Sequence, residues 1–231
     1  MILPKRCSKL SADHYKTTFD VVNKYMTSKF LTFLLLALCF YFPTNAVADI
    51  NDQALQRAQK YLSNLDTLKA NFHQISPFGD ITTGKFYLDR PGKLRFEYDD
   101  PLKDFIVADG TFIFYYDAAL DQQSNTLISQ TPADFILRQD LNLSGDIQVN
   151  NVSLTDGLIA ITVSQKEDPL SGQLTLGFQA EPFELVRWAI EDNQGGTTEI
   201  ILSNIERNTS LEGIKFYYQH PDFGKKPRYN Q

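Results

Sequence analysis

The sequence predicts a mainly β protein with helices (α+β). About ten or eleven short strands indicate an antiparallel sheet that curls into a barrel or half-barrel, with one helix before it and one inserted. Short runs that alternate apolar and polar residues follow one another from residue 69 onward, with tight turn signals between them. Alternation places every second side chain on one face of a strand. The chain has 17 Phe and 11 Tyr, and several of them fall on strand faces. A curled sheet with an aromatic concave face is expected either to pack a helix there or to hold an apolar ligand.

The first 48 residues are expected to be an N-terminal extension followed by a cleaved secretory signal peptide. Lys29 precedes an apolar run at residues 30–42, and Ala46-Val47-Ala48 follows it. A basic start, a short apolar run and an Ala-x-Ala site are the parts of a signal peptide, and the run is short for a membrane span. Met1 and Met26 both stay open as the true start, and an uncleaved N-terminal anchor is the alternative.

Both cysteines of the chain fall in this segment. The remaining residues 49–231 therefore have no thiol and no disulfide. Cys39 is preceded by Leu38, whereas the cleavage motif of a bacterial lipoprotein requires a small residue there. The sequence therefore favours an ordinary cysteine of the apolar run over a lipid attachment site.

Residues 49–231 are expected to form a single acidic domain. Residues 1–48 carry six basic and two acidic side chains, so 16 basic and 26 acidic side chains remain, for a net charge of −10. Such a surface repels nucleic acids and anionic lipid headgroups. A chain of 183 residues is enough for one domain with a sizeable core, and a monomer is expected.

A helix is expected over residues 49–65, where apolar residues recur at helical spacing. Asp49 or Asn51 can cap its start. Strands are expected after it, bounded by turn signals such as Asp109-Gly110 and Asp156-Gly157. The expected strands are residues 69–76, 81–90, 93–98, 104–108, 111–116, 122–128, 147–154, 158–164, 173–179, 183–192, 197–203 and 215–219.

A short helix over residues 131–138 interrupts the strand pattern. Thr131 is its expected cap, Pro132 takes the first helical position, and Asp134 lies in the first turn. The expected lid residues of this helix are three consecutive apolar side chains: Phe135, Ile136 and Leu137. A short apolar helix between strands is a candidate cover for the sheet.

The hairpin at residues 84–101 contains the main mechanistic clue. Phe86 and Leu88 share one face of its first strand, and Arg90 falls in line with them before the Pro91-Gly92 turn. Because arginine stays protonated, on an apolar face it must find hydrogen-bond acceptors. The plain alternative is a strand-end arginine whose stem covers apolar surface while its head reaches water.

The chain resembles the periplasmic outer-membrane lipoprotein carrier family (LolA) over nearly all of residues 49–231. The matching motifs are the Arg-Pro turn within residues 84–101, the Asp-Gly hairpin at residues 107–110, the run 112–116 with Asp117 and Gln122, the Thr131-Pro132 helix start and the closing run 215–218. The resemblance implies an unclosed antiparallel β-barrel with a helical lid over an apolar cavity, and this cavity receives the acyl chains of lipoproteins. It also implies that Arg90 is the lid latch, with its acceptors in the segment 131–143.

The resemblance makes the aromatic strand faces candidates for an acyl-chain cavity, although part of them must form an ordinary core. The candidate cavity residues are Phe86, Leu88, Leu94, Phe96, Tyr98, Phe105, Val107, Phe112, Phe114 and Tyr116. The implied partners are lipoproteins, the inner-membrane lipoprotein-releasing ABC transporter and, where one exists, an outer-membrane lipoprotein receptor.

Catalysis is not expected, and neither a cofactor nor a metal is expected. Residues 49–231 contain only His73 and His220 and no cysteine, so they lack the ligands of a typical zinc site and a Cys–His nucleophile. The sequence has neither a Gly-x-Ser-x-Gly motif nor a phosphate-binding loop. The expected function is that of a soluble periplasmic carrier that delivers lipoproteins from the inner to the outer membrane. The alternative is a membrane-associated lipoprotein acceptor or lipid-sensing interaction module with the same fold.

Overall fold

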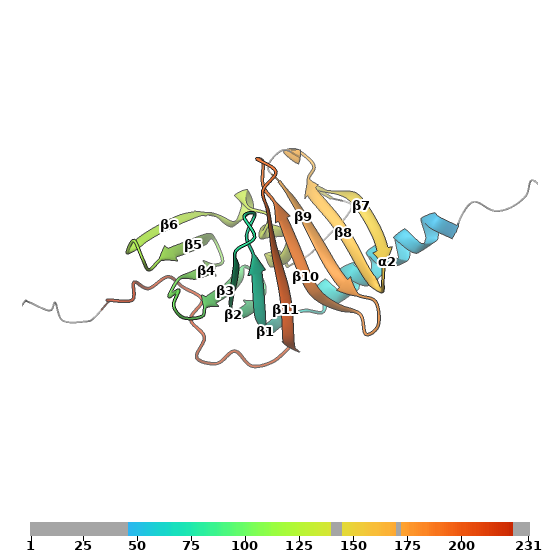
Figure 1. Cartoon of the computed structure of the whole chain (residues 1–231). Helices are drawn as coiled ribbons and strands as arrows, with labels where there is room; N and C mark the ends of the chain where they lie inside the picture. Colours follow the sequence, from blue (N-terminus) through green and yellow to red (C-terminus); the bar gives the residue numbers. More distant parts are fainter. Residues whose placement is uncertain (1–45, 140–144, 170–171, 224–231) are drawn as a thin grey trace, which may run out of the picture. The chain divides into compact units, whose positions relative to one another are not determined.

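The computed structural model describes residues 46–139, 145–169 and 172–223 of the chain (Figure 1). The chain divides into two compact units, Met1–Val47 and Ala48–Gln231, and the sheet and cavity belong to the second. The signal peptide expected within residues 1–48 lies outside the described residues, except that α2 begins at Ala46. No helix in the described part of the chain is long and apolar enough to cross a membrane.

The described strands form one antiparallel sheet of 11 strands in the order β6-β5-β4-β3-β2-β1-β11-β10-β9-β8-β7. Hairpins join sequence neighbours, and β1 pairs with β11 to connect the two halves. Since β6 and β7 are the two ends of this order, the sheet is an open barrel, as the sequence predicted. The strands are β1 Thr67–Ile75, β2 Ile81–Asp89, β3 Lys93–Tyr98, β4 Phe105–Asp109, β5 Phe112–Asp117, β6 Gln122–Leu127, β7 Ile147–Thr155, β8 Leu158–Gln165, β9 Gln173–Gln179, β10 Glu184–Glu191 and β11 Thr197–Arg207.

Helix α2 (Ala46–Ser63) packs on the half of the sheet that contains β9 and β10 (Figure 1). Tyr61 places its ring edge-on to Phe178, with 5.6 Å between the ring centroids, and Arg57 donates a 2.7 Å hydrogen bond to the carbonyl oxygen of Ala180. The helix buries Ala54, Ala58, Tyr61 and Leu62. Its apolar stripe therefore belongs to the main core, as helical spacing predicted.

The hairpin of β2 and β3 is in the register that the sequence suggested. Phe86 lies opposite Phe96, and Leu88 lies opposite Leu94, so all four side chains share one face. Gly84 makes room on this face: a Cβ atom there would lie 2.8 Å from the ring of Phe72 and 2.0 Å from the carbonyl oxygen of Glu97. The glycine therefore lets the Phe72 ring pack against the hairpin.

The strand expected over residues 215–219 is absent, which corrects that prediction. The segment lies instead against the outer face of β4 and β5. The ring of Tyr218 stacks on Phe114, with 5.5 Å between centroids, and on Phe105, with 5.9 Å between centroids. Its aromatic residues, which suggested a strand, are used for side-chain packing on the sheet.

Candidate binding cavity and lid

A cavity of about 550 Å³ lies on the inner face of β1–β5 and β9–β11, under residues 131–133 and helix α3 (Asp134–Leu137), which follow the 3-10 turn η1 (Ile128–Gln130). This volume is within the range of about 300–1,000 Å³ that is typical of small-molecule sites. The predicted residues that line it are Phe86, Leu94, Phe96, Tyr98 and the lid residue Ile136. Side chains of the hairpin and of the lid therefore line the same cavity.

Aromatic rings form part of the cavity wall. The centroids of Phe86 and Phe96 are 4.6 Å apart, and those of Phe86 and Trp188 are 5.2 Å apart. The sequence analysis did not single out Trp188, although it is the only tryptophan of the chain and lies on an expected strand. Trp188 and Ile190 are two residues apart in one strand and both line the cavity, so this spacing could have predicted that Trp188 faces inward.

Leu88 is buried in the main core and does not line the cavity. The lid residues Phe135 and Leu137 are also in this core, with exposed fractions of 2% and 1%. Only Ile136 of the three lid residues faces the cavity. Phe135 and Leu137 therefore anchor the lid to the core, while Ile136 is the side chain that an incoming ligand would contact.

Five predicted cavity residues lie on the opposite face of the sheet, which corrects their assignment. They are Phe105, Val107, Phe112, Phe114 and Tyr116. The register explains the difference, because Phe96 lies opposite Ile106 and Ile106 lies opposite Tyr115. Ile106, Ile113 and Tyr115 therefore line the cavity.

The alternation in β4 and β5 could not show which face was inward, since both faces of these strands are apolar. The outer face is covered: Phe105, Val107 and Tyr116 form a second core cluster, with Phe114 and Tyr218 packed against it. Residues 112–116 are apolar on both faces of the sheet, and the cover on the outer face includes the chain's own C-terminal segment.

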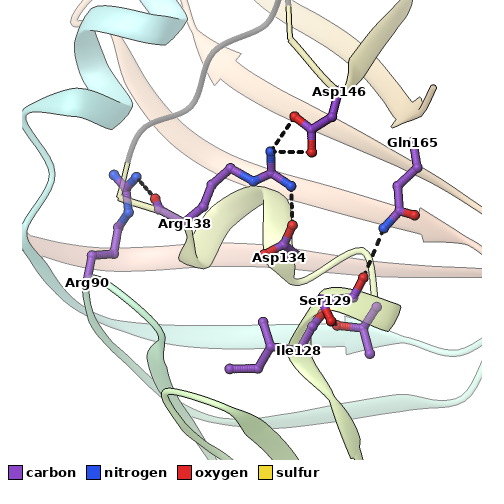
Figure 2. A network of polar contacts seen from close by, with 8 residues as sticks. Arg90, Ile128, Ser129, Asp134, Arg138, Asp146 and Gln165 are labelled. Atoms are coloured by element: carbon purple, nitrogen blue, oxygen red, sulfur yellow. Dashed lines mark hydrogen bonds and ion pairs between the residues drawn. The ribbon is translucent and has the colours of Figure 1, made fainter. Parts of the chain in front are cut away.

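Arg90 follows β2 and bridges two helices. Its Nη1 donates hydrogen bonds to the carbonyl oxygens of Leu62 and, at 3.2 Å, Leu65 at the end of α2. Its Nη2 donates to the carbonyl oxygens of Arg138 and, at 3.1 Å, Gln139 just after α3. Figure 2 shows the guanidinium turned toward Arg138. The acceptors on the lid side fall within the segment that the resemblance implied, whereas no prediction named the end of α2.

The chemistry of helix ends explains this arrangement. The last carbonyl groups of a helix have no partner within the helix and carry partial negative charge. A guanidinium presents several donors in a rigid plane and can satisfy such groups from two helices together. The next turn adds a further tie, because the backbone N–H of Gly92 donates a 2.8 Å hydrogen bond to the carbonyl oxygen of Leu137.

A second network holds the lid at its other side (Figure 2). Arg138 donates to the carboxylates of Asp134 and Asp146, and its distances to the two oxygens of Asp146 are 2.8 and 3.0 Å. The hydrogen bond from Arg138 lowers the pKa of Asp146 below its ordinary value. Gln165 on β8 donates a 3.2 Å hydrogen bond to the carbonyl oxygen of Ser129. The lid is therefore fixed by polar contacts at its edges and by apolar contacts beneath.

Two polar pairs lie in the cavity wall. The hydroxyl of Tyr98 donates a 2.8 Å hydrogen bond to Oε1 of Gln74, and the hydroxyl of Tyr115 donates a 2.8 Å hydrogen bond to Oδ2 of Asp104. Burial raises the pKa of Tyr98 to about 12. Burial and the neighbouring Asp104 carboxylate also raise the pKa of Tyr115. Both tyrosines therefore stay protonated near neutral pH.

The described residues contain no group of three or more His, Cys, Asp or Glu side chains placed to hold a metal ion. His73 and His220 lie on different parts of the domain: His73 is on β1, while His220 contacts Asp121 at 3.1 Å on the outer side of the sheet. The arrangement of the cavity is thus that of an apolar container with a few hydrogen-bonding groups.

The sequence is similar to proteins of one known family. The family model "Outer membrane lipoprotein carrier protein LolA" matches residues 63–219. The outer-membrane lipoprotein carrier protein of Dechloromonas aromatica is 31% identical over 199 residues, which cover 81% of this chain and 92% of the relative. The protein of the same name from Methylococcus capsulatus is 27% identical with the same coverage.

Among solved structures, a LolA superfamily protein from Nitrosomonas europaea is similar with a TM-score of 0.41 and 12% identity. That match covers 73% of this chain and 97% of the other. The match of the family model over more than half of the chain, together with a relative at 31% identity, confirms the resemblance found in the sequence. This chain belongs to the outer-membrane lipoprotein carrier family.

Proposed function

We propose that this protein carries lipoproteins by holding their acyl chains in the cavity between the sheet and the lid. The observation that carries the proposal is the position of Arg90, which closes a lid over an apolar cavity of about 550 Å³ through backbone hydrogen bonds. The names of the relatives, all outer-membrane lipoprotein carrier proteins, support the choice of cargo. The role is transport, since the family is one of carriers.

The energetics suit a lid that opens when lipid enters. Each hydrogen bond to a charged donor contributes about 1.5–3 kcal/mol, while each buried acyl methylene gains about 0.8 kcal/mol. About two to four methylenes therefore offset one bond of the latch. An acyl chain that reaches Ile136 displaces α3, and Arg90 loses its acceptors at Arg138 and Gln139. When the cargo leaves, the same bonds close the lid again.

We propose that the protein works in the periplasm, as a single carrier domain of residues 49–231 after removal of residues 1–48. The support is the basic residue Lys29, the apolar run 30–42 and the Ala-x-Ala site at residues 46–48. On this proposal an inner-membrane ABC transporter loads the carrier, and an outer-membrane receptor or the outer membrane itself receives the cargo. The acidic surface of the domain discourages binding to anionic membranes on the way.

Native mass spectrometry of the protein purified from the periplasm of its own host, with a co-expressed lipoprotein, tests this proposal. Wild type is expected to carry acylated protein and to release it to acceptor membranes. Arg90→Leu is expected to stay loaded, because it lacks the bonds that favour the closed, empty state. Arg187→Leu is the matched control: Arg187 on β10 pairs with Glu199 on β11 at 3.2 Å, so its variant also loses an arginine contact and should behave as wild type.

Three outcomes would contradict parts of the proposal. Absence of acylated cargo from both wild type and Arg90→Leu would show that the cavity is not a lipid site. If Arg90→Leu released its cargo at the wild-type rate, the carrier role would stand but Arg90 would not be the latch of the lid. Recovery of the wild-type protein in the membrane fraction, with cargo that never transfers, would favour a membrane-associated acceptor.

A further inference from the structure

One end of the cavity is polar, although most of the remaining wall is apolar. The turns after β1, β3 and β5 and the turn before β11 lie at the same end of the sheet. At this end, each of the strands β1 to β5 and β11 has a polar side chain that lines the cavity, in the strand or just before it. These side chains are Gln74, Thr82, Tyr98, Asp104, Tyr115 and Thr198. Gln74 lies directly opposite Thr82 in the register of β1 and β2. We call this set the polar end.

Asp104 is the one charged side chain of the polar end and is fixed in place. Its Oδ2 accepts the 2.8 Å hydrogen bond from the Tyr115 hydroxyl, and its Oδ1 accepts a 3.0 Å hydrogen bond from the backbone N–H of Ala118. Two donors thus hold the carboxylate at the cavity wall. The Asp104 side chain therefore presents a stationary negative charge to whatever occupies this end.

Thr82 at the polar end has a hydroxyl group that is not hydrogen-bonded within the described part of the chain. Its Oγ1 is buried and has no hydrogen-bond partner among the described residues. Buried polar atoms in folded proteins are nearly always hydrogen-bonded, so such an atom in the wall of a cavity needs a reason. A ligand with an ester or amide carbonyl supplies an acceptor for this hydroxyl.

The turns around the polar end add negative charge. Asp80 lies in the turn after β1, Asp99 and Asp100 lie in the turn after β3, and Asp192 lies in the turn before β11. Lys103 is the only basic side chain in these three turns. Anionic groups that approach this end are therefore repelled before they reach Asp104.

We propose that the polar end is a headgroup site that accepts neutral acyl esters and amides and excludes acyl chains that end in a carboxylate or phosphate. The inference rests on the proposed function, because the acyl chains of a lipoprotein are joined to their protein by ester and amide bonds. Neutral carbonyl and N–H groups can bond to Thr82, Tyr98 and Gln74. A carboxylate would instead be desolvated beside the Asp104 carboxylate, where like charges repel strongly.

Displacement of the neutral dye Nile red from the purified protein measures this preference. The competitors are monolaurin, a neutral glyceryl ester, and laurate, a carboxylate with the same acyl chain, both below the concentrations at which they form micelles. Wild type is expected to bind monolaurin at least about tenfold more tightly than laurate. Asp104→Asn is expected to reduce this ratio to below about threefold by strengthening laurate binding alone.

Asp109→Asn is the matched control, because Asp109 is the exposed last residue of β4, at the opposite end of that strand from Asp104. Its ratio should equal that of wild type. Thr82→Val is a second variant, which removes the unpartnered hydroxyl without changing the shape of the side chain. It is expected to weaken monolaurin binding about threefold to tenfold while leaving laurate binding unchanged.

Each outcome decides something different. Equal binding of monolaurin and laurate by wild type, or an unchanged ratio in Asp104→Asn, would overturn the headgroup site and leave the lipid carrier in place. Failure of both ligands to displace the dye at every concentration would count against the proposed function itself. A ratio that also falls in Asp109→Asn would show a general effect of net charge and would overturn the assignment to Asp104.

Discussion

Gly92 forms the turn beside Arg90 with a φ of +83°, a conformation that disfavours residues with a Cβ atom. A Cβ atom at this position would also lie 2.8 Å from the Cα atom of Gly110 in the neighbouring hairpin turn. The two turns are therefore in contact at their glycines, and this contact helps to place Arg90 next to the lid.

Replacement of this glycine should destabilise the fold more than replacement of an unconstrained one. We expect Gly92→Ala to lower the free energy of unfolding by about 3 kcal/mol, from backbone strain and from the clash with Gly110. Gly195→Ala is the control, because Gly195 has a φ of +82° and nothing within 4 Å of its Cβ position. We expect it to cost about 1 kcal/mol. Urea denaturation measures both values, and equal losses would show that the clash is relieved.

At the scale of elements, the lid depends on an ion pair that responds to pH. Asp146 has a pKa below its ordinary value of 3.8 because Arg138 hydrogen-bonds its carboxylate. A carboxyl group with a lowered pKa stabilises the folded state above its ordinary pKa, and this contribution is lost as the pH falls through the lowered pKa. The side chain of Asp146 is 65% exposed, so the contribution is at most about 1 kcal/mol.

The variant Asp146→Asn isolates this contribution. At neutral pH wild type should be more stable than the variant by a few tenths to about 1 kcal/mol. The difference should shrink toward zero as the pH falls below 3.8, the ordinary pKa of the group. Urea denaturation across this range gives the difference directly. A gap that persists under the most acidic conditions would assign the effect to shape or packing and not to charge.

The elements themselves were largely predictable from the sequence, but the direction of their faces was not. Turn signals such as Asp109-Gly110 and Asp156-Gly157 placed hairpins correctly, and β2 and β3 alternate so clearly that their inner face could be read. Strands β4 and β5 are apolar on both faces, so local alternation carries no information about which face is inward. The outer cover, which includes Tyr218, is about 100 residues away in sequence, and only the folded chain reveals it.

For Arg90 too, the sequence predicted the need for hydrogen-bond acceptors but did not predict all of the residues that supply them. Its position at the end of an apolar row indicated that it needs acceptors. Its partners are carbonyl oxygens, and every residue supplies one, so no residue type marks them in the sequence. The pairing of β1 with β11 joins the first and last strands in sequence at the middle of the sheet, which hydrophobic periodicity could not predict.

At the scale of the whole domain, one core connects the helices and both halves of the sheet. Leu62 of α2, Phe86 of β2, Phe135 of α3 and Phe178 of β9 all belong to a single cluster of buried side chains. Elements that share one core are expected to unfold together. Trp188, which is 4% exposed, lies in this cluster and is the only tryptophan of the chain.

Fluorescence of Trp188 and far-ultraviolet circular dichroism should therefore report the same unfolding transition in urea. We expect coincident midpoints, because loss of the sheet removes the aromatic packing around Trp188 at the same step. A tryptophan midpoint clearly below the circular-dichroism midpoint would show that the cavity region opens before the sheet, and would separate the stability of the site from that of the fold.

The contacts of Arg90 have one more consequence, which concerns how such a protein can change. Arg90 donates to the backbone carbonyl oxygens of Leu62, Leu65, Arg138 and Gln139. Every residue type supplies such a carbonyl, so a substitution at the exposed Gln139 keeps its hydrogen bond as long as the backbone keeps its course. Exposed side chains after α3 can therefore change while the backbone contacts of Arg90 remain.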